Sequence, residues 1–314
     1  MTVTLQLNQQ DFEIDLKEGI NKIAVIGSGI MGAGIAAHCA NAGCEVLLYD
    51  LADEESENRS NVAANAISKM KKSNPEMLMH PGFAKQIQAV NLEDDLQLLS
   101  GVDWVIEVIV ENLEIKRSLY SKIEEFINPN AILTSNTSTI PRASLVEKMS
   151  DSLASRFLIT HFFNPPRYLP LLEIVAGTEV EEHLFHRFSI FATEKLGKRV
   201  TICNDSPGFI GNRLGIYFVQ RAIAAALDYG FTVEQTDAML GRPIGLPKTA
   251  VFGLMDLVGI DLVPQVVNSM VENLPSTDPL HKIAGKGQEI IEQMIEDGYT
   301  GRKGKGGFYR LNTD

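Results

Sequence analysis

The stretch KIAVIGSGIMGAGIAAHCANAGCEVLLYD, residues 22–50, decides the fold of this chain. It begins with a short apolar run of strand type that leads into Gly27, Gly29 and Gly32, and a run of small and apolar residues of helical type follows. A second apolar run ends at Asp50. The spacing GxGxxG alone is also compatible with an ordinary glycine-rich turn. Because a strand precedes it, a helix follows it and an acidic residue closes the next strand, the pattern predicts a dinucleotide-binding βαβ unit.

The three glycines have separate physical tasks in such a unit. Gly27 allows the tight turn, Gly29 lets the backbone approach the pyrophosphate of a dinucleotide, and Gly32 lets the helix pack closely on the strand. The pyrophosphate is expected at the N-terminus of the helix, where the backbone amides favour an anion. Ile30 and Met31 lie in that first turn, so we count them with the glycines as cofactor-binding residues.

Asp50 predicts which dinucleotide is bound. A carboxylate at the end of the second strand accepts hydrogen bonds from the adenosine ribose hydroxyls, and its negative charge repels a 2′-phosphate. No arginine directly follows Asp50 in the sequence. We therefore expect NAD rather than NADP as the cofactor.

Length and periodicity predict two domains. With 314 residues, of which 45% are hydrophobic, the chain has enough material for two domains of ordinary size. Strand and helix patterns alternate as far as about residue 205, and they include a buried strand, GVDWVIEVIV, that is expected to end at Glu111. Beyond that point the periodicity is helical. We predict an α/β fold with an N-terminal extension (1–20), a Rossmann-type NAD-binding domain containing a mainly parallel sheet (21–205) and an all-α C-terminal domain (206–314).

The composition argues against several classes of protein. A formal charge of −12 disfavours a general nucleic-acid surface, which needs concentrated lysine and arginine, but is compatible with a small anionic ligand. No apolar run reaches the roughly 18 to 20 residues of a membrane span, and the acidic N-terminus has no features of a signal peptide, so we expect a cytoplasmic location. The three cysteines lack metal-ligand spacing, which indicates reduced, apolar side chains and no metal site.

A second stretch, THFFNPPRYLPLLEIV (160–175), places a histidine and a glutamate in an apolar setting. His161 follows an apolar run that is expected to form a strand, and ligands collect at the carboxyl ends of strands in open α/β sheets. Glu173 lies in a second apolar run, where an unpaired carboxylate would be costly. A hydrogen bond between the two would fix the tautomer of the imidazole and raise its basicity. The alternative is a structural histidine and a surface glutamate.

Residues 53 to about 95 are polar and helical in pattern, and they contain Lys69, Lys71 and Lys72. A lysine cluster on an otherwise acidic protein is compatible with a solvated helix face. It is equally compatible with a site for the phosphorylated tail of a substrate. The pattern alone leaves both interpretations open.

Eight motifs follow one another along the chain: VIGSGIMGAGIA, the acidic strand end at Asp50, VENLEIK, SNTST, HFFNPP with the Glu173 segment, SPGFIGNR, DLVGID and GKGGFY. In this order they resemble the L-3-hydroxyacyl-CoA dehydrogenase family of fatty-acid β-oxidation, over nearly the whole chain from about Asn21. The resemblance implies an NAD-binding domain, a helical C-terminal domain that forms a homodimer, and an active site in the cleft between the two domains. The implied substrate is an (S)-3-hydroxyacyl-CoA, oxidised at C3 to a 3-oxoacyl-CoA in β-oxidation or in short-chain hydroxybutyryl-CoA metabolism.

The resemblance also implies catalytic roles. His161 matches the catalytic histidine of the family, and Glu173 matches its partner. Ser138 and Asn212 match substrate-contacting residues of the catalytic site. From the sequence alone, Ser138 is also compatible with the N-cap of a helix that begins near Pro141, and Asn212 with an ordinary helix residue.

Further positions match residues around the cofactor and the CoA moiety. Glu111, Lys116 and Asn136 match positions near the nicotinamide end of NAD, and Lys72 approximately matches a lysine that contacts CoA. The stretch GRPIGLPKTAVFGLMDLVGID is longer than in many stand-alone members and is more similar to long proteins that fuse this module to a crotonase-type hydratase. The sequence is therefore compatible with a single-function enzyme and with a fragment of a fused one.

Two other functions stay open on the sequence. One is a dehydrogenase of a free 3-hydroxy acid, which would use a lysine base and an arginine for the carboxylate. The other is a non-enzymatic NAD-binding protein of the same fold, since fold does not determine function.

Overall fold

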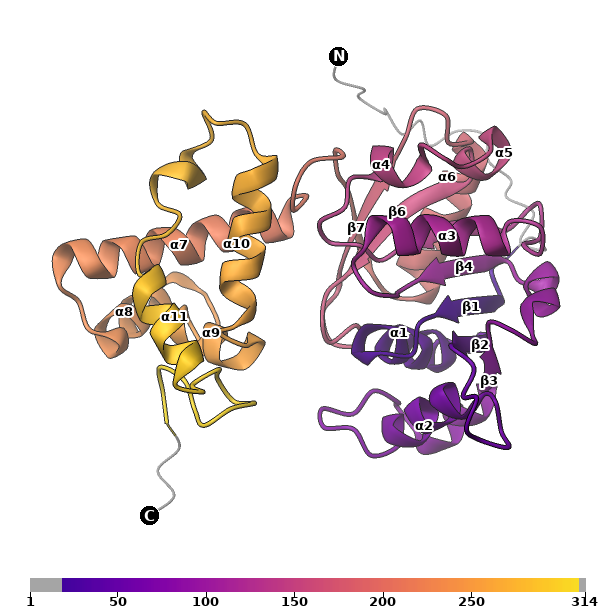
Figure 1. Cartoon of the computed structure of the whole chain (residues 1–314), viewed down its shortest axis with the longest axis horizontal. Coiled ribbons are helices and arrows are strands. Elements are labelled where there is room, and N and C mark those ends of the chain that lie inside the picture. Colours follow the sequence, from indigo (N-terminus) through magenta and orange to yellow (C-terminus); the bar gives the residue numbers. More distant parts are fainter. Residues whose placement is uncertain (1–18, 311–314) are drawn as a thin grey trace. The chain divides into compact units, whose positions relative to one another are not determined.

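The computed structural model describes residues 19–310 and is shown in Figure 1. Contacts within the chain divide it into two compact units. The first unit contains the chain up to Thr137 together with Arg142–Ile202, and the second contains Ser138–Pro141 together with the chain from Cys203 onward. The predicted N-terminal extension lies outside the described residues except for its last two positions.

The first unit is built on one eight-stranded sheet with the order β3-β2-β1-β4-β5-β6-β7-β8. The strands from β3 to β6 in this order run parallel, whereas β7 is antiparallel to β6 and β8 is parallel to β7. This topology confirms the predicted α/β fold with a mainly parallel, Rossmann-type sheet. The strands are β1 (Lys22–Ile26), β2 (Glu45–Asp50), β3 (Ile87–Asn91), β4 (Trp104–Glu107), β5 (Ile132–Ser135), β6 (Phe157–Phe162), β7 (Leu171–Ala176) and β8 (Arg199–Ile202).

Helices and short turns of helix connect these strands, except for β6 and β7, which a loop connects (Figure 1). The strand order reverses between β1 and β4, and in open α/β sheets such a reversal creates the crevice in which ligands bind. The α-helices are α1 (Ile30–Asn41), α2 (Asn61–Met70), α3 (Leu113–Ile123), α4 (Arg142–Val146), α5 (Asp151–Ala154) and α6 (Glu182–Ile190), with 3-10 helices at Pro81–Gln86 and Leu96–Gly101 and a π-helical turn at Phe191–Lys195.

The core of the first unit forms because its central strands are apolar on both faces, as parallel strands covered by helices must be. Helix α1 is equally apolar, and its small side chains are buried from Gly32 to Ala40. Around the single tryptophan, Trp104, three phenylalanine rings pack within 6.4 Å between centroids. Trp104 Nε1 also donates a hydrogen bond to Thr134 Oγ1 at 2.9 Å, so its polar atom is satisfied inside the core.

Two predictions about this unit were wrong. The polar region after Asp50, predicted to be helical throughout, contains the edge strand β3, which pairs with β2 from Val46↔Ile87 onward. This strand, IQAVN, is only five residues long and mixes apolar with polar side chains, so the polar region around it hides its strand character. In addition, β4 ends at Glu107 and not at Glu111, because the chain leaves the sheet three residues before its apolar run ends at Val110.

The second unit is helical, as predicted. Among the described residues its α-helices are α7 (Gly211–Tyr229), α8 (Val233–Leu240), α9 (Phe252–Val258), α10 (Leu262–Asn273) and α11 (Gln288–Glu296), with 3-10 helices at Arg242–Ile244 and Pro279–Lys282. Helix α7 ends at Gly230, whose left-handed backbone (φ 68°) suits glycine. The core of the unit includes Ile223, Phe252, Met255 and Val267, which come from three of these helices.

Within residues 19–310, no single helix is long and apolar enough to cross a membrane. Helices α9 and α10 satisfy the criteria of length and composition only when they are taken together, and they are bent by 99° with respect to each other.

Candidate functional site

The glycine-rich turn between β1 and α1 is sterically tight. Gly27 has φ 107°, and a Cβ atom there would lie 2.5 Å from the carbonyl oxygen of Val108 in the segment after β4. A Cβ atom on Gly32 would lie 1.8 Å from the carbonyl oxygen of Gly27. Such distances exclude a side chain at both positions. Gly27 therefore permits the turn, and Gly32 permits the close approach of the helix to it.

Gly29 differs from the other two glycines because no atom lies within 4 Å of a Cβ built on it. It occupies the N-cap of α1, no side chain caps this helix, and its first turn carries no acidic residue. The side chain of Ile30 is 71% exposed and that of Met31 is half-buried. Open space therefore adjoins the helix N-terminus and its backbone amides, which is the arrangement that fits a pyrophosphate.

Asp50 is held at the end of β2 by the same turn. Its Oδ2 accepts a hydrogen bond from the backbone nitrogen of Ser28 at 2.7 Å and a second, short one from Ser28 Oγ. Its Oδ1 accepts from the nitrogen of Leu51 at 2.8 Å. Ser28 was not among the predicted site residues, although its place between two glycines of the motif identifies the loop to which it belongs. These bonds orient the carboxylate beside the turn.

His161 and Glu173 face each other across the antiparallel pair β6–β7, where they are register partners. His161 Nδ1 lies 2.7 Å from Glu173 Oε2. The side chain of Glu173 is fully buried and that of His161 is 7% exposed, so the alternative of a surface glutamate is wrong. An ionised carboxylate can only accept, which makes Nδ1 the donor and leaves Nε2 as the basic nitrogen of the ring.

Asn136 links the end of β5 to the strand of His161. Its Oδ1 accepts a hydrogen bond from the nitrogen of Phe162 at 2.9 Å, and its own backbone nitrogen donates to the oxygen of Glu107 at 2.9 Å. The ring of Phe163 lies 4.5 Å from that of His161 between centroids. The predicted site residues Asn136, His161 and Glu173 are thus brought together at neighbouring positions in the sheet.

Lys116 is buried in α3 with its side chain 1% exposed. Its Nζ lies 3.3 Å from Glu111 Oε2, so two residues predicted near the nicotinamide are ion-paired. A closer pair joins Lys116 Nζ to Glu107 Oε1 at 2.6 Å. Glu107 was missed by the sequence analysis. A charged residue in the middle of the apolar run WVIEVIV is the signal that could have identified it.

The remaining predicted residues lie in different parts of the chain. Asn212 is the second residue of α7 in the second unit, and Ser138 belongs to that unit through the short stretch Ser138–Pro141. Helix α4 begins at Arg142, so Ser138 lies three residues before the cap position and is not the N-cap. Lys72 follows the end of α2 in the first unit, where its side chain is exposed, as are those of Lys69 and Lys71.

Comparison with known families is decisive at this point. Residues 22–206 match the family described as 3-hydroxyacyl-CoA dehydrogenase, NAD binding domain. Residues 208–311 match 3-hydroxyacyl-CoA dehydrogenase, C-terminal domain. The chain belongs to the 3-hydroxyacyl-CoA dehydrogenase family. The predicted resemblance is therefore confirmed, and the glycine-rich turn lies in a domain that binds a dinucleotide of the NAD type.

Individual relatives agree with this membership. A Rickettsia prowazekii protein whose name describes a fatty acid oxidation complex trifunctional enzyme is 40% identical over 95% of this chain, which spans 41% of that protein. A Deinococcus radiodurans protein whose name describes a 3-hydroxyacyl-CoA dehydrogenase is 38% identical over 94% of this chain and 84% of its own length. The chain thus spans less than half of some of its 3-hydroxyacyl-CoA dehydrogenase relatives and most of others.

Two solved structures share the fold. FadB2 of M. tuberculosis has a TM-score of 0.75 and 29% identity, covering 94% of this chain and all of the other. The (S)-3-hydroxybutyryl-CoA dehydrogenase of Ralstonia eutropha has a TM-score of 0.74 and 25% identity, with the same coverage.

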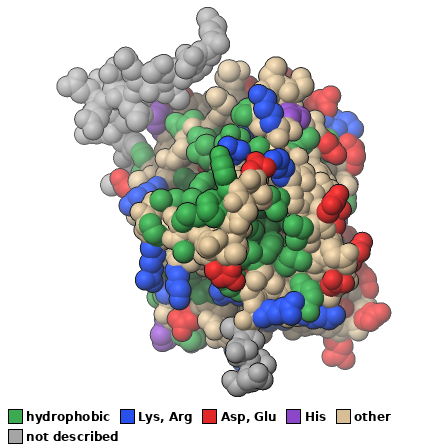
Figure 2. Space-filling model, turned by 90° about the vertical axis from the view of Figure 1, so that its left-hand side faces the viewer, with side chains coloured by type: hydrophobic (Ala, Val, Ile, Leu, Met, Phe, Trp, Pro, Cys, Tyr) green, Lys and Arg blue, Asp and Glu red, His purple; other side chains and the backbone are tan. Residues whose placement is uncertain are grey.

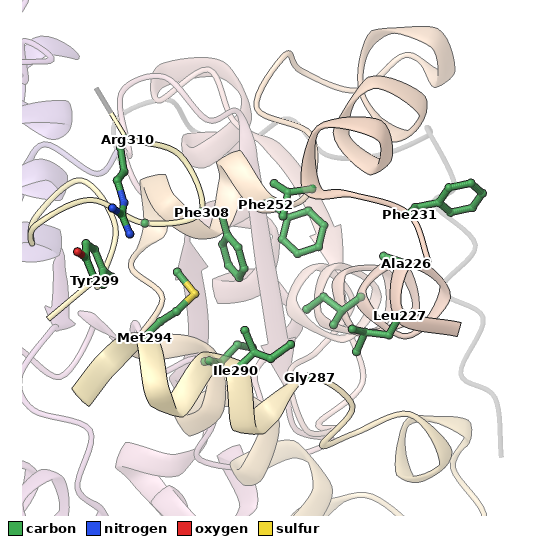
Figure 3. A pocket seen from close by; sticks show the side chains of 14 residues that line it. Ala226, Leu227, Phe231, Phe252, Gly287, Ile290, Met294, Tyr299, Phe308 and Arg310 are labelled. Carbon is green, nitrogen blue, oxygen red and sulfur yellow. The ribbon is translucent and has the colours of Figure 1, made fainter. Parts of the chain in front are cut away.

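The second unit contains an apolar cavity of about 360 Å³ (Figure 3). In Figure 3 the side chains of Phe252, Met294 and Phe308 surround a common space, and the rings of Phe252 and Phe308 lie 4.7 Å apart between centroids. None of the residues predicted for the site of a 3-hydroxyacyl-CoA dehydrogenase lines this cavity. Figure 2 shows hydrophobic side chains gathered on the surface of this unit.

Proposed function

We propose that this protein oxidises the 3-hydroxyl of an (S)-3-hydroxyacyl-CoA to a 3-oxoacyl-CoA, with NAD as the cofactor. The observation that carries the proposal is the buried His161–Glu173 pair at 2.7 Å in the same sheet as the glycine-rich turn. Strands β1 and β6 point in the same direction through a continuous set of parallel neighbours. His161 and the glycine-rich turn therefore lie at the same carboxyl edge, where ligands of such sheets bind, and this supports the proposal.

His161 acts as the general base. Its Nε2 takes the proton of the 3-hydroxyl, and Glu173 holds the ring in the required tautomer and stabilises the imidazolium that forms. NAD, when bound, supplies the acceptor for the hydride that leaves C3. Ser138 and Asn212 hydrogen-bond the substrate oxygen and orient C3, and Lys72 contacts the CoA moiety. Support for these three roles comes from the family motifs SNTST and PGFIGNR and from the exposed position of Lys72.

NAD is held by two groups of residues. The first consists of the glycine-rich turn and helix start, with Asp50 on the adenosine ribose, and the charge of Asp50 favours NAD over NADP. The second lies toward the nicotinamide. Gly27, Gly29, Ile30, Met31, Gly32 and Asp50 form the first group, and Glu111, Lys116 and Asn136 form the second.

We further propose a cytoplasmic homodimer formed through the second unit. Exposed apolar side chains on α7, α8 and α11 support the dimer, because a contiguous apolar surface on a folded unit indicates an interaction site. We also propose that the chain has two domains, an NAD-binding domain over residues 21–205 and a helical domain over residues 206–314.

The test compares wild-type protein with His161→Gln. We expect wild-type protein to oxidise NADH with acetoacetyl-CoA, measured by the loss of absorbance at the NADH band, and to be inactive on a free 3-oxo acid. His161→Gln should lose activity by about 10²-fold or more, the usual contribution of a general base, and still bind NADH. An active His161→Gln enzyme contradicts the assigned base, activity only on the free acid indicates the alternative dehydrogenase, and no activity on any CoA thioester indicates a non-enzymatic protein.

A further inference from the structure

A closed ring of contacts joins five residues near the carboxyl ends of β4 and β5. Its members are Glu107, Lys116, Glu111, Thr137 and Ser135, and we call it the carboxylate ring. Lys116 Nζ contacts Glu107 Oε1 at 2.6 Å and Glu111 Oε2 at 3.3 Å. Thr137 Oγ1 donates to Glu111 Oε1, the nitrogen of Thr137 donates to Ser135 Oγ at 3.2 Å, and Ser135 Oγ donates to Glu107 Oε2 at 2.7 Å.

Glu107 is the hub of the carboxylate ring. Its side chain is fully buried, and besides the two ring bonds it accepts from the nitrogen of Ile109 at 2.8 Å and from Tyr120 Oη at 2.7 Å. Burial and the neighbouring Glu107 carboxylate raise the pKa of Tyr120 well above its usual range, so this hydroxyl keeps its proton and donates. Two oxygens that accept four donors leave Glu107 no capacity for a ligand. Glu107 can therefore affect a ligand only through the residues that it contacts, such as Lys116.

Lys116 and Glu111 lie at the end of the sheet where the nicotinamide half of a dinucleotide is expected. Asp50 marks the adenosine side at the end of β2, and the strand order reverses between β1 and β4. A dinucleotide that lies across this crevice extends from the end of β2 past β1 toward the ends of β4 and β5. The carboxylate ring occupies that end of the sheet, and Glu107 and Ser135 are register partners there. Glu111, with its side chain 36% exposed, is the ring member that reaches solvent most.

We propose that Glu107 is a positioning residue for the nicotinamide half of NAD, and that it acts by fixing Lys116 and, through Lys116, Glu111. The inference rests on the proposed function for the identity of the ligand. Without the Glu107 carboxylate, the buried Lys116 ammonium loses its closest partner and turns toward Glu111 alone, which misplaces both groups. The adenosine half, held by the glycine-rich turn and Asp50, is unaffected.

The test measures the dissociation constants of NADH and of ADP for wild-type protein and for Glu107→Gln. ADP probes the adenosine half without the nicotinamide. We expect Glu107→Gln to weaken NADH binding by about tenfold, as for the loss of one charge-assisted contact, and ADP binding by less than about twofold. Unchanged NADH binding, or an equal loss for both ligands, would overturn the inference. Wild-type protein that does not bind NADH would contradict the proposed function itself.

Two further variants separate positioning from general loosening. Tyr120→Phe removes a different donor from the same carboxylate and leaves the ring closed, so NADH affinity should stay within about twofold of wild type. In the double variant Glu107→Gln/Lys116→Met, NADH should bind no more weakly than in Lys116→Met alone, because residues that act through one contact are not additive. A loss in Tyr120→Phe as large as in Glu107→Gln, or full additivity in the double variant, would contradict the proposal.

Ser135→Ala provides the same test if Glu107→Gln does not fold. It removes a neutral ring member that contacts Glu107 Oε2 and the nitrogen of Thr137. NADH binding should weaken by about threefold, as expected for a neutral hydrogen bond, with ADP binding unchanged. Equal effects on the two ligands would overturn the inference.

Discussion

Two histidines of the first unit have opposite electrostatic surroundings. His161 is paired through Nδ1 with the buried carboxylate of Glu173. His38, near the end of α1, has its Nε2 2.9 Å from the oxygen of Leu196, and its Nδ1 has no hydrogen-bond partner among the described residues. Burial, the nearby cation of Lys198 and, more weakly, that of Arg167 lower the pKa of His38 to about 4, against the bond to Leu196. His161 is therefore paired with a carboxylate, whereas burial and two nearby cations keep His38 neutral.

The lowered pKa of His38 predicts a loss of stability in mild acid. The unfolded chain protonates this histidine near pH 6.5, whereas the folded protein does so only near pH 4, so the unfolded state binds more protons between these values. The free energy of unfolding should therefore fall as the pH is lowered from 6.5 to 4. Between pH 7.5 and 5 this group alone contributes a loss of about 2 kcal/mol.

Urea denaturation of wild-type protein and of His38→Asn at both pH values measures this contribution. Asparagine does not titrate in this range, so the variant should lose about 2 kcal/mol less than wild type on acidification. Equal losses in the two proteins would show that His38 is not responsible. The difference between two proteins cancels the contributions of all other titrating groups.

Glu107 shows where residue-level prediction was incomplete. A carboxylate in an apolar run needs a partner, and this holds for Glu107 in WVIEVIV as it does for Glu173. Its partners, Lys116, Tyr120 and Ser135, come from α3 and β5. Lys116 and Tyr120 are four residues apart and share one face of α3, which the helical period allows. The approach of Ser135 depends on the pairing of β4 with β5.

At the level of elements, the glycines of the β1–α1 turn differ in purpose. Some are needed for steric reasons, and Gly29 is needed only for the proposed ligand. A side chain on Gly32 would collide with the backbone of Gly27, whereas a side chain on Gly29 would enter open space at the helix N-terminus. The same motif thus contains two glycines that the fold needs, Gly27 and Gly32, and one that the fold can lose, Gly29. Gly101, at the opposite end of β4, also has no atom within 4 Å of an added Cβ and offers a matched control.

Substitutions by alanine test this separation. Gly32→Ala should lower the free energy of unfolding by about 2 kcal/mol or more, as overpacking against backbone does, and abolish NADH binding. The free energy of unfolding of Gly29→Ala should lie within about 0.5 kcal/mol of the wild-type value. This variant should nevertheless bind NADH at least about tenfold more weakly, because its Cβ occupies the space proposed for the pyrophosphate.

The measurements are denaturant unfolding and NADH titration, with Gly101→Ala expected to match wild type in both. Wild-type affinity in Gly29→Ala would place the dinucleotide elsewhere. A fully stable Gly32→Ala protein would contradict the close approach of helix and turn.

At the scale of the whole molecule, the second unit exposes large apolar side chains on α7, α8 and α11. Leu227, Phe231 and Ile290 line its cavity and are nevertheless 48%, 45% and 51% exposed. Burial of such side chains in a second copy stabilises a dimer by about 1.5 to 3 kcal/mol each at most. Figure 2 shows hydrophobic side chains on the surface of this unit.

A charge introduced on this surface should prevent dimerisation. We expect wild-type protein to have twice the mass of the chain in size-exclusion chromatography with light scattering, and Leu227→Glu/Ile290→Glu to have the mass of one chain, because a buried unpaired carboxylate is costly. Met79 lies on the first unit and is 62% exposed, so Met79→Glu is the matched control. This variant should stay dimeric. A monomeric wild type, or a dimeric double variant, would contradict the proposed interface.

The sequence alone determined the class of fold, and it predicted the glycine-rich turn and the His161–Glu173 pair, because each depends on local pattern. A strand, a glycine turn, a helix and an acidic strand end are contiguous, and their spacing is set by backbone geometry. The helical character of the second unit follows from periodicity in the same way. His161 and Glu173 could be proposed as partners because only a short hairpin separates them.

Only the tertiary structure revealed the edge strand β3, the end of β4 and the carboxylate ring, because each depends on pairing between segments that are distant in the sequence. The edge strand β3 was missed because its five residues, IQAVN, lie within a longer polar region, and their pairing with β2 is not visible locally. The end of β4 at Glu107 is set by the length of its neighbours β1 and β5. The carboxylate ring joins residues from two strand ends and a helix, and no single stretch of sequence contains it. When two strands pair in the sheet but lie far apart in the sequence, no short turn fixes their register. That register is a property of the packed sheet.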